Sequence, residues 1–270
     1  MPPPSVPQPF DRALLRRRLD RAAPQFAAAD FLKRRAAGDI ADRLELILRD
    51  FPLAVDLGAR TGHVREALAG SRVGALIESD LSLAMLAGRG GLRVQADEER
   101  LPFAPASVDL VVSALALHPV NDFVGALIAA RQALKPGGAF IAAMLGGGTL
   151  TELRHALIEA ETALYGGAGP RVAPFLNPLD APGLLQRAGF SEPVADVDRV
   201  TVGYADPLAL MLDLRRMAET AVMTERSRRP LTRSLLARVF DLYPKRSDSR
   251  IEATFEIVTL TGWAASGSAT

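Results

Sequence analysis

The sequence predicts an α/β fold in which a mostly parallel β-sheet is covered by helices on both faces. First, short and almost continuously apolar segments alternate with segments of helical pattern from residue 51 to residue 146, which is typical of strands buried on both faces. Second, glycines follow the first of these segments and acidic residues end the next two, so polar groups gather at one edge of the sheet. Third, 49% of the 270 residues are hydrophobic, which suffices for a large core.

The elements follow in chain order. Residues 1–9 are rich in proline and predict a disordered leader, and residues 10–50 predict two or three helices interrupted near Pro24. The predicted strands of the core are Leu53–Leu57, Val73–Ile77, Leu92–Ala96, Val108–Ser113 and Ala139–Leu145. The predicted helices between them are Val64–Ala69, Ser82–Ala87 and Asp122–Leu134, the last ending at Pro136-Gly137-Gly138.

Residues 147–270 are expected to complete the sheet. A helix over Thr149–Tyr165 is predicted, with Thr149 as its N-cap and Glu152 at the spacing of a capping box. Two β-prone stretches, Val197–Gly203 and Ala253–Thr261, predict a terminal hairpin. The arginine-rich helical segment 207–244 between them then forms a cap above one edge of the sheet.

Composition excludes several classes of function. The chain has no cysteine and three scattered histidines, so we expect no disulfide, no thiol nucleophile and no metal site. Its formal net charge is only +1, so the chain lacks the excess of basic residues that is typical of a nucleic-acid-binding domain. No apolar run reaches the ~18 residues of a transmembrane helix. We therefore expect a cytoplasmic location, with a position peripheral to the inner membrane as the alternative. Oligomeric state is left open.

The turn after the first predicted strand, Asp56-Leu57-Gly58-Ala59-Arg60-Thr61-Gly62, indicates a ligand site. Its glycines have G-x-x-x-G spacing, whereas a dinucleotide site has G-x-G-x-x-G. Asp56 precedes the first glycine by two residues, and a carboxylate there repels phosphates but suits a ligand with an ammonium and a sulfonium, such as S-adenosylmethionine. The predicted cofactor contacts in this turn are Asp56, Gly58, Ala59, Arg60 and Gly62.

Further polar residues lie where an adenosine needs them. Asp80 ends the second predicted strand, 22 residues after Gly58, close to the spacing at which a carboxylate accepts ribose hydroxyls. Asp97, at the end of the third strand, is placed to accept from the adenine amino group. An acid at a strand end is also a common helix N-cap. The cofactor interpretation therefore depends on the motifs occurring together, in order, each at the end of the appropriate strand. The remaining predicted cofactor contacts are Leu81, Glu98 and Ser113.

From Leu53 to Leu145 these motifs resemble the class I S-adenosylmethionine-dependent methyltransferases. The resemblance implies a Rossmann-like fold with a mostly parallel seven-stranded sheet, S-adenosylmethionine as cofactor and a cofactor-binding core over residues 51–146. Family members usually carry D-x-G-x-G-x-G, and here Arg60 replaces the middle glycine. Three consequences stay open: Arg60 occludes the methionine part of the cofactor, pairs with its carboxylate, or points outward.

The loop after the fourth predicted strand indicates which kind of methyl acceptor to expect. It reads Ser113-Ala114-Leu115-Ala116-Leu117-His118-Pro119 and lacks the N/D-P-P-Y/F motif of N-methyltransferases that act on nucleic acids. Nucleic acid is therefore excluded as the expected substrate. His118 is the titratable residue placed to act as a general base or to orient a substrate. A loop histidine satisfied by the backbone is the alternative interpretation.

Motifs beyond the core resemble the complex I assembly factors that have a methyltransferase fold, which include an arginine hydroxylase acting on a quinone-site subunit. The matching segments are Phe10-Asp11-Arg12, Ala96–Phe103, Leu115–Asp122, Ala143–Arg154, Arg187–Phe190 and Gly262-Trp263. Pro119 replaces the family's tryptophan. The resemblance implies an S-adenosylmethionine-dependent enzyme that modifies a protein substrate, a subunit of respiratory complex I. The alternatives are a small-molecule or carrier-protein O-methyltransferase and a non-catalytic assembly chaperone.

Overall fold

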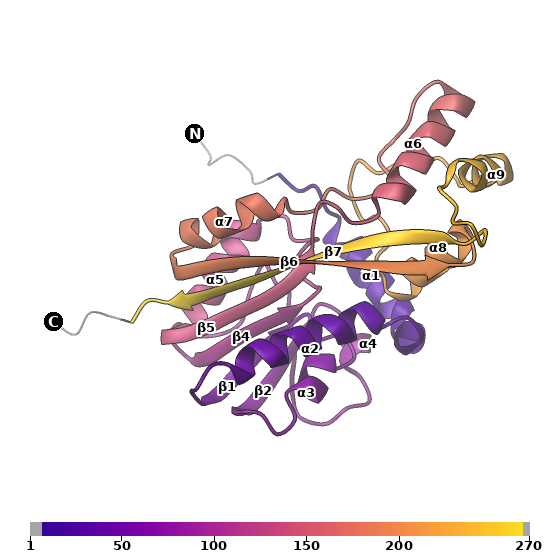
Figure 1. Cartoon of the computed structure of the whole chain (residues 1–270). Coiled ribbons are helices and arrows are strands. Elements are labelled where there is room, and N and C mark those ends of the chain that lie inside the picture. The colour runs from indigo at the N-terminus through magenta and orange to yellow at the C-terminus, as the bar shows by residue number, and fades with distance from the viewer. Residues whose placement is uncertain (1–6, 267–270) are drawn as a thin grey trace.

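A computed structural model describes residues 7–266 as a seven-stranded sheet with helices on both faces (Figure 1). The strand order is β3-β2-β1-β4-β5-β7-β6, and β7 runs antiparallel between β5 and β6 while the other strands are parallel. The strands of the core are β1 (Phe51–Leu57), β2 (Val73–Asp80), β3 (Leu92–Gln95), β4 (Val108–Ala114) and β5 (Leu134–Leu145). The predicted fold class is confirmed.

Strand β5 begins earlier than the sequence predicts. Pro136-Gly137-Gly138 was expected to end a helix, but the residues lie inside the strand. The register with β4 shifts between the pairs Val108–Leu134 and Leu110–Ala139, so these residues form an irregularity that the neighbouring strand does not match. Proline has no N–H to donate, and such irregularities are where a sheet tolerates it.

Two helical layers bury the two faces of the sheet. The helices α2 (Phe31–Glu45) and α3 (His63–Ala67) cover one face, and α5 (Phe123–Ala133) and α7 (Ala181–Arg187) cover the other. Side chains alternate between the faces with the period of a strand. In β5, Ile141 packs in the first core cluster and Phe140 in the second.

The N-terminal helices lie against the edge at which the parallel strands end. Helix α1 (Arg12–Ala22) is followed by the 3-10 helix η1 (Ala23–Ala28), which contains Pro24, so the predicted break is confirmed. Leu19 of α1 packs with Met85 of the short helix α4 (Leu83–Leu86) and with Val222. The predicted leader lies largely outside the described residues, and the predicted division into domains stays a prediction.

The last two strands extend beyond the parallel part of the sheet and carry a helical cap (Figure 1). They are β6 (Phe190–Tyr204) and β7 (Ile251–Ala264), and their antiparallel pairing confirms the predicted interrupted hairpin. The insertion holds α8 (Pro207–Arg216) and α9 (Arg233–Leu242), separated by a loop rather than forming one helical run. Helix α6 (Thr151–Tyr165) packs against α9, and a short 3-10 helix, η2 (Pro178–Asp180), precedes α7.

The predicted cap of α6 is wrong. The helix begins at Thr151, and its N-cap position is Leu150 in a left-handed conformation with φ of 56°. Thr149 is instead buried, and its hydroxyl bonds the backbone of Glu256 in β7. Glu152 accepts from the Thr254 backbone rather than from its own helix. Tertiary contacts with β7 therefore replace the local capping box.

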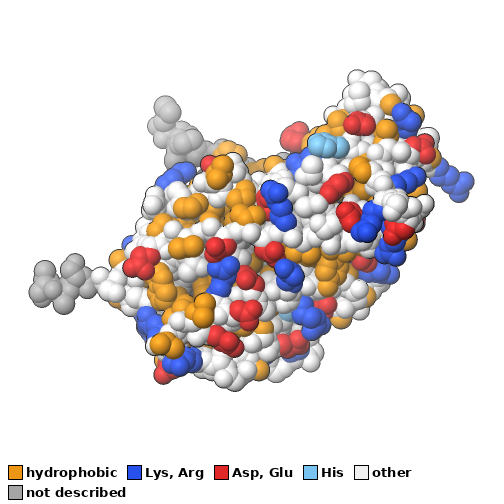
Figure 2. Space-filling view, viewed as in Figure 1, with side chains coloured by type: hydrophobic (Ala, Val, Ile, Leu, Met, Phe, Trp, Pro, Cys, Tyr) orange, Lys and Arg blue, Asp and Glu red, His pale blue; other side chains and the backbone are white. Residues whose placement is uncertain are grey.

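Charged side chains of both signs are interspersed over the face shown in Figure 2. Two ion pairs join α2 to the edge strand β6, Arg35 with Asp198 at 2.8 Å and Arg43 with Asp196 at 2.6 Å. Within residues 7–266, no helix combines the length and the apolar character needed to cross a membrane.

Candidate functional site

The glycine turn after β1 has the backbone geometry that its sequence suggests. Gly58 and Gly62 have φ values of +71° and +92°, and Arg60 between them has φ of +50°. A β-carbon on Gly58 would lie 2.1 Å from the Ala116 β-carbon, so close packing as well as the positive φ demands glycine there. Arg60 adopts the left-handed region without that freedom, which is uncommon for a side chain of its size.

Arg60 and Asp80 form a buried ion pair. The guanidinium Nη1 lies 2.9 Å from Asp80 Oδ2, and the Arg60 backbone N–H donates to the same oxygen at 2.8 Å. The other oxygen, Oδ1, accepts from Ser82 N–H at 2.8 Å. Both side chains are buried, with exposures of 4% and 0%. The interpretation in which Arg60 points outward is therefore wrong.

A second cation from the N-terminal helices holds the acids after β3. The guanidinium of Arg12 in α1 bonds Asp97 at 2.6 Å and also contacts Glu98. Glu98 is buried, and this burial raises its pKa. Asp97, predicted to accept from the adenine amino group, and the predicted cofactor contact Glu98 are thus bound by the protein's own arginine.

A third cation, Lys33 of α2, lies beneath the glycine turn. Its ammonium donates to the carbonyl oxygen of Gly58 at 2.5 Å and to that of Ala114 at the end of β4. Burial lowers the pKa of Lys33 to about 8. The Asp56 carboxylate is buried with both oxygens lacking a hydrogen-bond partner, and burial raises its pKa to about 7.

The remaining predicted contacts lie in the same region with different surroundings. Ser113 is fully buried and donates to the Leu57 carbonyl oxygen at 2.8 Å, which links β4 to β1. Ala59 is buried in the glycine turn. Leu81 packs with the cluster that holds the N-terminal helices. The structure thus brings the predicted cofactor residues to one edge of the sheet.

These residues supply acceptors for an adenosine, but the fit depends on Arg60. Asp80 already accepts two hydrogen bonds at Oδ2 and one at Oδ1, so only one acceptor position is left for the two ribose hydroxyls in the conformation described. Arg12 likewise engages Asp97. The site therefore fits S-adenosylmethionine only after the Arg60 guanidinium leaves Asp80.

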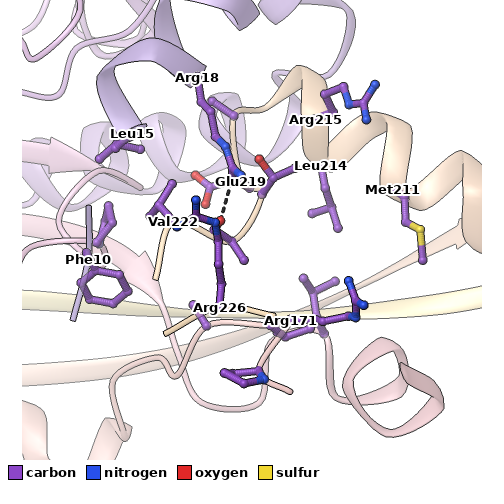
Figure 3. A pocket seen from close by; sticks show the side chains of 18 of the residues that line it. Phe10, Leu15, Arg18, Arg171, Met211, Leu214, Arg215, Glu219, Val222 and Arg226 are labelled. Atoms are coloured by element: carbon purple, nitrogen blue, oxygen red, sulfur yellow. Dashed lines mark hydrogen bonds between the residues drawn. The ribbon is translucent and has the colours of Figure 1, made fainter. Parts of the chain in front are cut away.

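A cavity of about 300 Å³ adjoins this edge, between α1, α6, α8 and the loop after β4 (Figure 3). Its inner wall includes Arg60, His118 and Glu219. His118 Nε2 lies 2.8 Å from Glu219 Oε2, while His118 Nδ1 has no hydrogen-bond partner. His118 is also packed edge-on against Phe175 at 5.8 Å between ring centroids. Although burial opposes it, the neighbouring His118 keeps the pKa of Glu219 below its usual range.

Sequence reasoning missed the partners of the predicted residues. Arg12, Lys33 and Glu219 come from three segments remote from the core motifs, and only folding brings them to the site. A signal existed for Lys33, since the chain has just three lysines and this one shares a helix face with the apolar Ala36 and Ala37. Glu219 follows α8 in a loop and carries no comparable signal.

The buried Asp56 should make stability depend on pH. An aspartate in the unfolded chain titrates near ~3.9, whereas burial raises the pKa of folded Asp56 to about 7. Between these values the folded chain binds more protons, so the free energy of unfolding falls as pH rises. In calorimetry from about pH 5 to about pH 7.5, we expect the Tm of wild type to fall relative to that of Asp56→Asn. Parallel curves for the two proteins would contradict the assignment.

Comparison with known proteins identifies a methyltransferase domain and a related fold. Residues 55–142 match a family model described as a methyltransferase domain. The Haemonchus contortus phosphoethanolamine N-methyltransferase 2, solved in complex with S-adenosyl-L-methionine, superposes with a TM-score of 0.56 at 16% identity, covering 93% of this chain and 60% of that chain. At this identity the likeness concerns the fold alone.

Curated relatives match nearly the whole chain. The Mus musculus protein named arginine-hydroxylase NDUFAF5, mitochondrial, is 39% identical over 263 residues, covering 94% of this chain and 77% of the relative. The malonyl-[acyl-carrier protein] O-methyltransferase of Methylovorus sp. is 33% identical over 270 residues, covering 94% of this chain and 89% of the relative.

The relatives correct the predicted location. The NDUFAF5 proteins of mouse, zebrafish and human are all named mitochondrial, so the cytoplasmic prediction is wrong. The prediction failed because it relied on composition. The absence of cysteine is compatible with any reducing compartment and does not distinguish one from another. The long NDUFAF5 matches, together with the methyltransferase-domain match, show the family and its cofactor: this chain belongs to the NDUFAF5 family, whose members are enzymes of the class I S-adenosylmethionine-dependent methyltransferase fold.

Proposed function

We propose that this protein uses S-adenosylmethionine to modify a side chain of a protein substrate, a subunit of respiratory complex I, during assembly of that complex. The observation that carries the proposal is the His118–Glu219 pair, which lines a cavity next to the cofactor residues. The length of the match to relatives named arginine-hydroxylase supports a protein side chain as the acceptor.

The cofactor residues have separate roles in this proposal. Asp80 accepts the ribose hydroxyls once Arg60 has left it, and Asp97 with Glu98 receives the adenine amino group. The turn formed by Gly58, Ala59 and Gly62 faces the methionine part. Asp56, Leu81 and Ser113 support this arrangement from the strand ends. The bound cofactor supplies the sulfonium chemistry of the family.

His118 and Glu219 act on the acceptor. His118 Nε2–H donates to the Glu219 carboxylate, which orients the ring and leaves the buried Nδ1 without a partner. Nδ1 can therefore accept a proton from a substrate group that reaches it. The Glu219 carboxylate is the acidic group that lines the cavity, and it can bind a guanidinium. An arginine side chain therefore suits the inner wall.

A carrier-protein O-methyltransferase is the second candidate. The Methylovorus relative with this name aligns over 94% of this chain. In addition, Arg18, Arg171, Arg215 and Arg226 line the same cavity, and this excess of positive charge suits a carboxylate acceptor.

Mass spectrometry of complex I tests the proposal. We expect complex I subunits from cells that lack this protein to lose a mass increment of one methylene on an arginine, because a methyl group from S-adenosylmethionine replaces one hydrogen of the side chain. The wild-type gene should restore it. An unchanged set of arginine modifications together with normal complex I activity in the deletion strain would refute the proposal.

His118 gives a sharper expectation. We expect His118→Ala to lower the rate of substrate modification by about a hundredfold, as for the loss of a positioned acid or base. The matched control is His155→Ala, because His155 is exposed on α6 and does not line the cavity. Equal rates for His118→Ala and wild type would remove His118 from the reaction.

A further inference from the structure

Two arginines in the wall of the cavity lack an acidic partner. Arg18 of α1 and Arg226 of the loop between α8 and α9 both line it, and both are half-buried. Figure 3 shows their side chains reaching toward one another from opposite sides. Among residues 7–266, neither guanidinium lies within 4 Å of an aspartate or glutamate oxygen.

Backbone contacts hold both guanidinium groups in place. Arg18 Nη1 donates to the Ala221 carbonyl oxygen at 2.6 Å, and Arg226 Nη1 donates to that of Met223 at 2.9 Å. Each guanidinium has five N–H donors, so most of them remain free. Burial, and next the charge of Arg226, lowers the pKa of Arg18. Two half-buried guanidinium groups repel each other, and a bound anion would offset this repulsion.

Part of the cavity wall is apolar, while Arg60, His118, Arg171, Arg215 and Glu219 add further charged or titratable groups. Its walls include leucines of α1, α6 and α8 and a methionine of α8, namely Leu15, Leu150, Leu153, Leu157, Met211 and Leu214. A volume of about 300 Å³ lies at the small end of ligand pockets. A ligand that fits both the arginine pair and the leucine-lined wall has one anionic head group and a short apolar tail.

We propose that Arg18 and Arg226 form an anion site that binds the carboxylate of a short-chain aliphatic acid, with its tail in the leucine-lined cavity. The planar guanidinium groups suit the bidentate geometry of a carboxylate. The inference rests on the cavity that the proposed function assigns to the acceptor, but the binding itself requires neither the cofactor nor group transfer.

Octanoate is the probe. In isothermal titration with the full chain, we expect octanoate to bind at least tenfold more tightly than 1-octanol, which has the same tail without the charge. Octyltrimethylammonium should show no binding. Equal affinity for octanoate and 1-octanol, or binding of the cation, would overturn the proposal.

Variants then locate the head group. We expect Arg18→Met and Arg226→Met each to weaken octanoate binding about tenfold, and Arg226→Lys to lose less. The matched controls are Arg16→Met on the same helix and Arg228→Met in the same loop, since both residues are exposed. If Arg18→Met does not fold, Arg226→Met carries the test. Unchanged octanoate affinity in the folded variants would place the anion elsewhere and overturn the assignment.

Titration with S-adenosylmethionine keeps this test separate from the proposed function. Among residues 7–266, Arg18 and Arg226 form no hydrogen bond with the cofactor residues, so we expect Arg226→Met to bind the cofactor as wild type does. Loss of octanoate binding with unchanged cofactor binding supports the anion site. Loss of both would indicate a general collapse of the cavity and would contradict the specific role of these arginines.

Discussion

Replacing Arg60 by glycine is expected to raise the affinity for S-adenosylmethionine on the order of a hundredfold. While Arg60 and Ser82 hold Asp80, its carboxylate keeps only one free acceptor position, so binding of both ribose hydroxyls must first break a buried ion pair. Breaking such a pair by removing one partner typically costs about 3–5 kcal/mol, and every ~1.4 kcal/mol changes an affinity tenfold. In Arg60→Gly the Arg60–Asp80 ion pair is already absent, so cofactor binding does not have to break it.

The same substitution should affect stability in two opposing ways. It leaves the Asp80 carboxylate buried without its guanidinium partner, which destabilises the fold. It also relieves a positive φ of 50°, which glycine tolerates better than arginine. Since the ion pair is the larger contribution, we expect a lower Tm without cofactor and a larger rise in Tm when S-adenosylmethionine is added.

Isothermal titration of both proteins with S-adenosylmethionine measures the effect. The matched control is Arg65→Met, because Arg65 also pairs with a buried acid of β2, Glu78 at 3.0 Å, but lies outside the cofactor turn. Its cofactor affinity should equal that of wild type. If Arg60→Gly binds no more tightly than wild type, Arg60 does not compete with the ribose.

Replacing Lys33 by methionine is expected to lower stability by about 2–6 kcal/mol, because each of two buried carbonyl groups left without its donor costs about 1–3 kcal/mol. The buried ammonium bonds the carbonyl oxygens of Gly58 and Ala114, and its charge favours the ionised form of Asp56. Methionine fills similar space but donates nothing, so two carbonyl groups lose their donor and Asp56 loses its nearest cation.

A double-mutant cycle with Asp56→Asn isolates the charge interaction. We expect Lys33→Met to cost less in the Asp56→Asn background, with a coupling of about 1–3 kcal/mol in urea unfolding. Lys245→Met serves as the control, because Lys245 is exposed in the loop after α9 and its loss should change little. Additive effects of the two substitutions would show that Lys33 does not interact with Asp56.

The sequence predicted the sheet well because the relevant signals are local. Buried parallel strands are apolar along their whole length, so each core strand could be recognised from its own residues. The acids at Asp80 and Asp97 were recognisable for the same reason, since each immediately follows or ends a strand. The local signal failed at Thr149, where β7 supplies partners that a capping box cannot anticipate.

The sequence by itself therefore determined the positions of the core strands along the chain, the family and the edge at which the polar residues meet. Only the tertiary structure decided what those residues contact. Arg12, Lys33 and Arg60 come from two helices and one turn, yet each bonds a group predicted to bind cofactor. The physical reason is that strand formation depends on neighbours in the chain, whereas the pairing of a buried charge depends on whichever opposite charge the fold brings within a few ångströms.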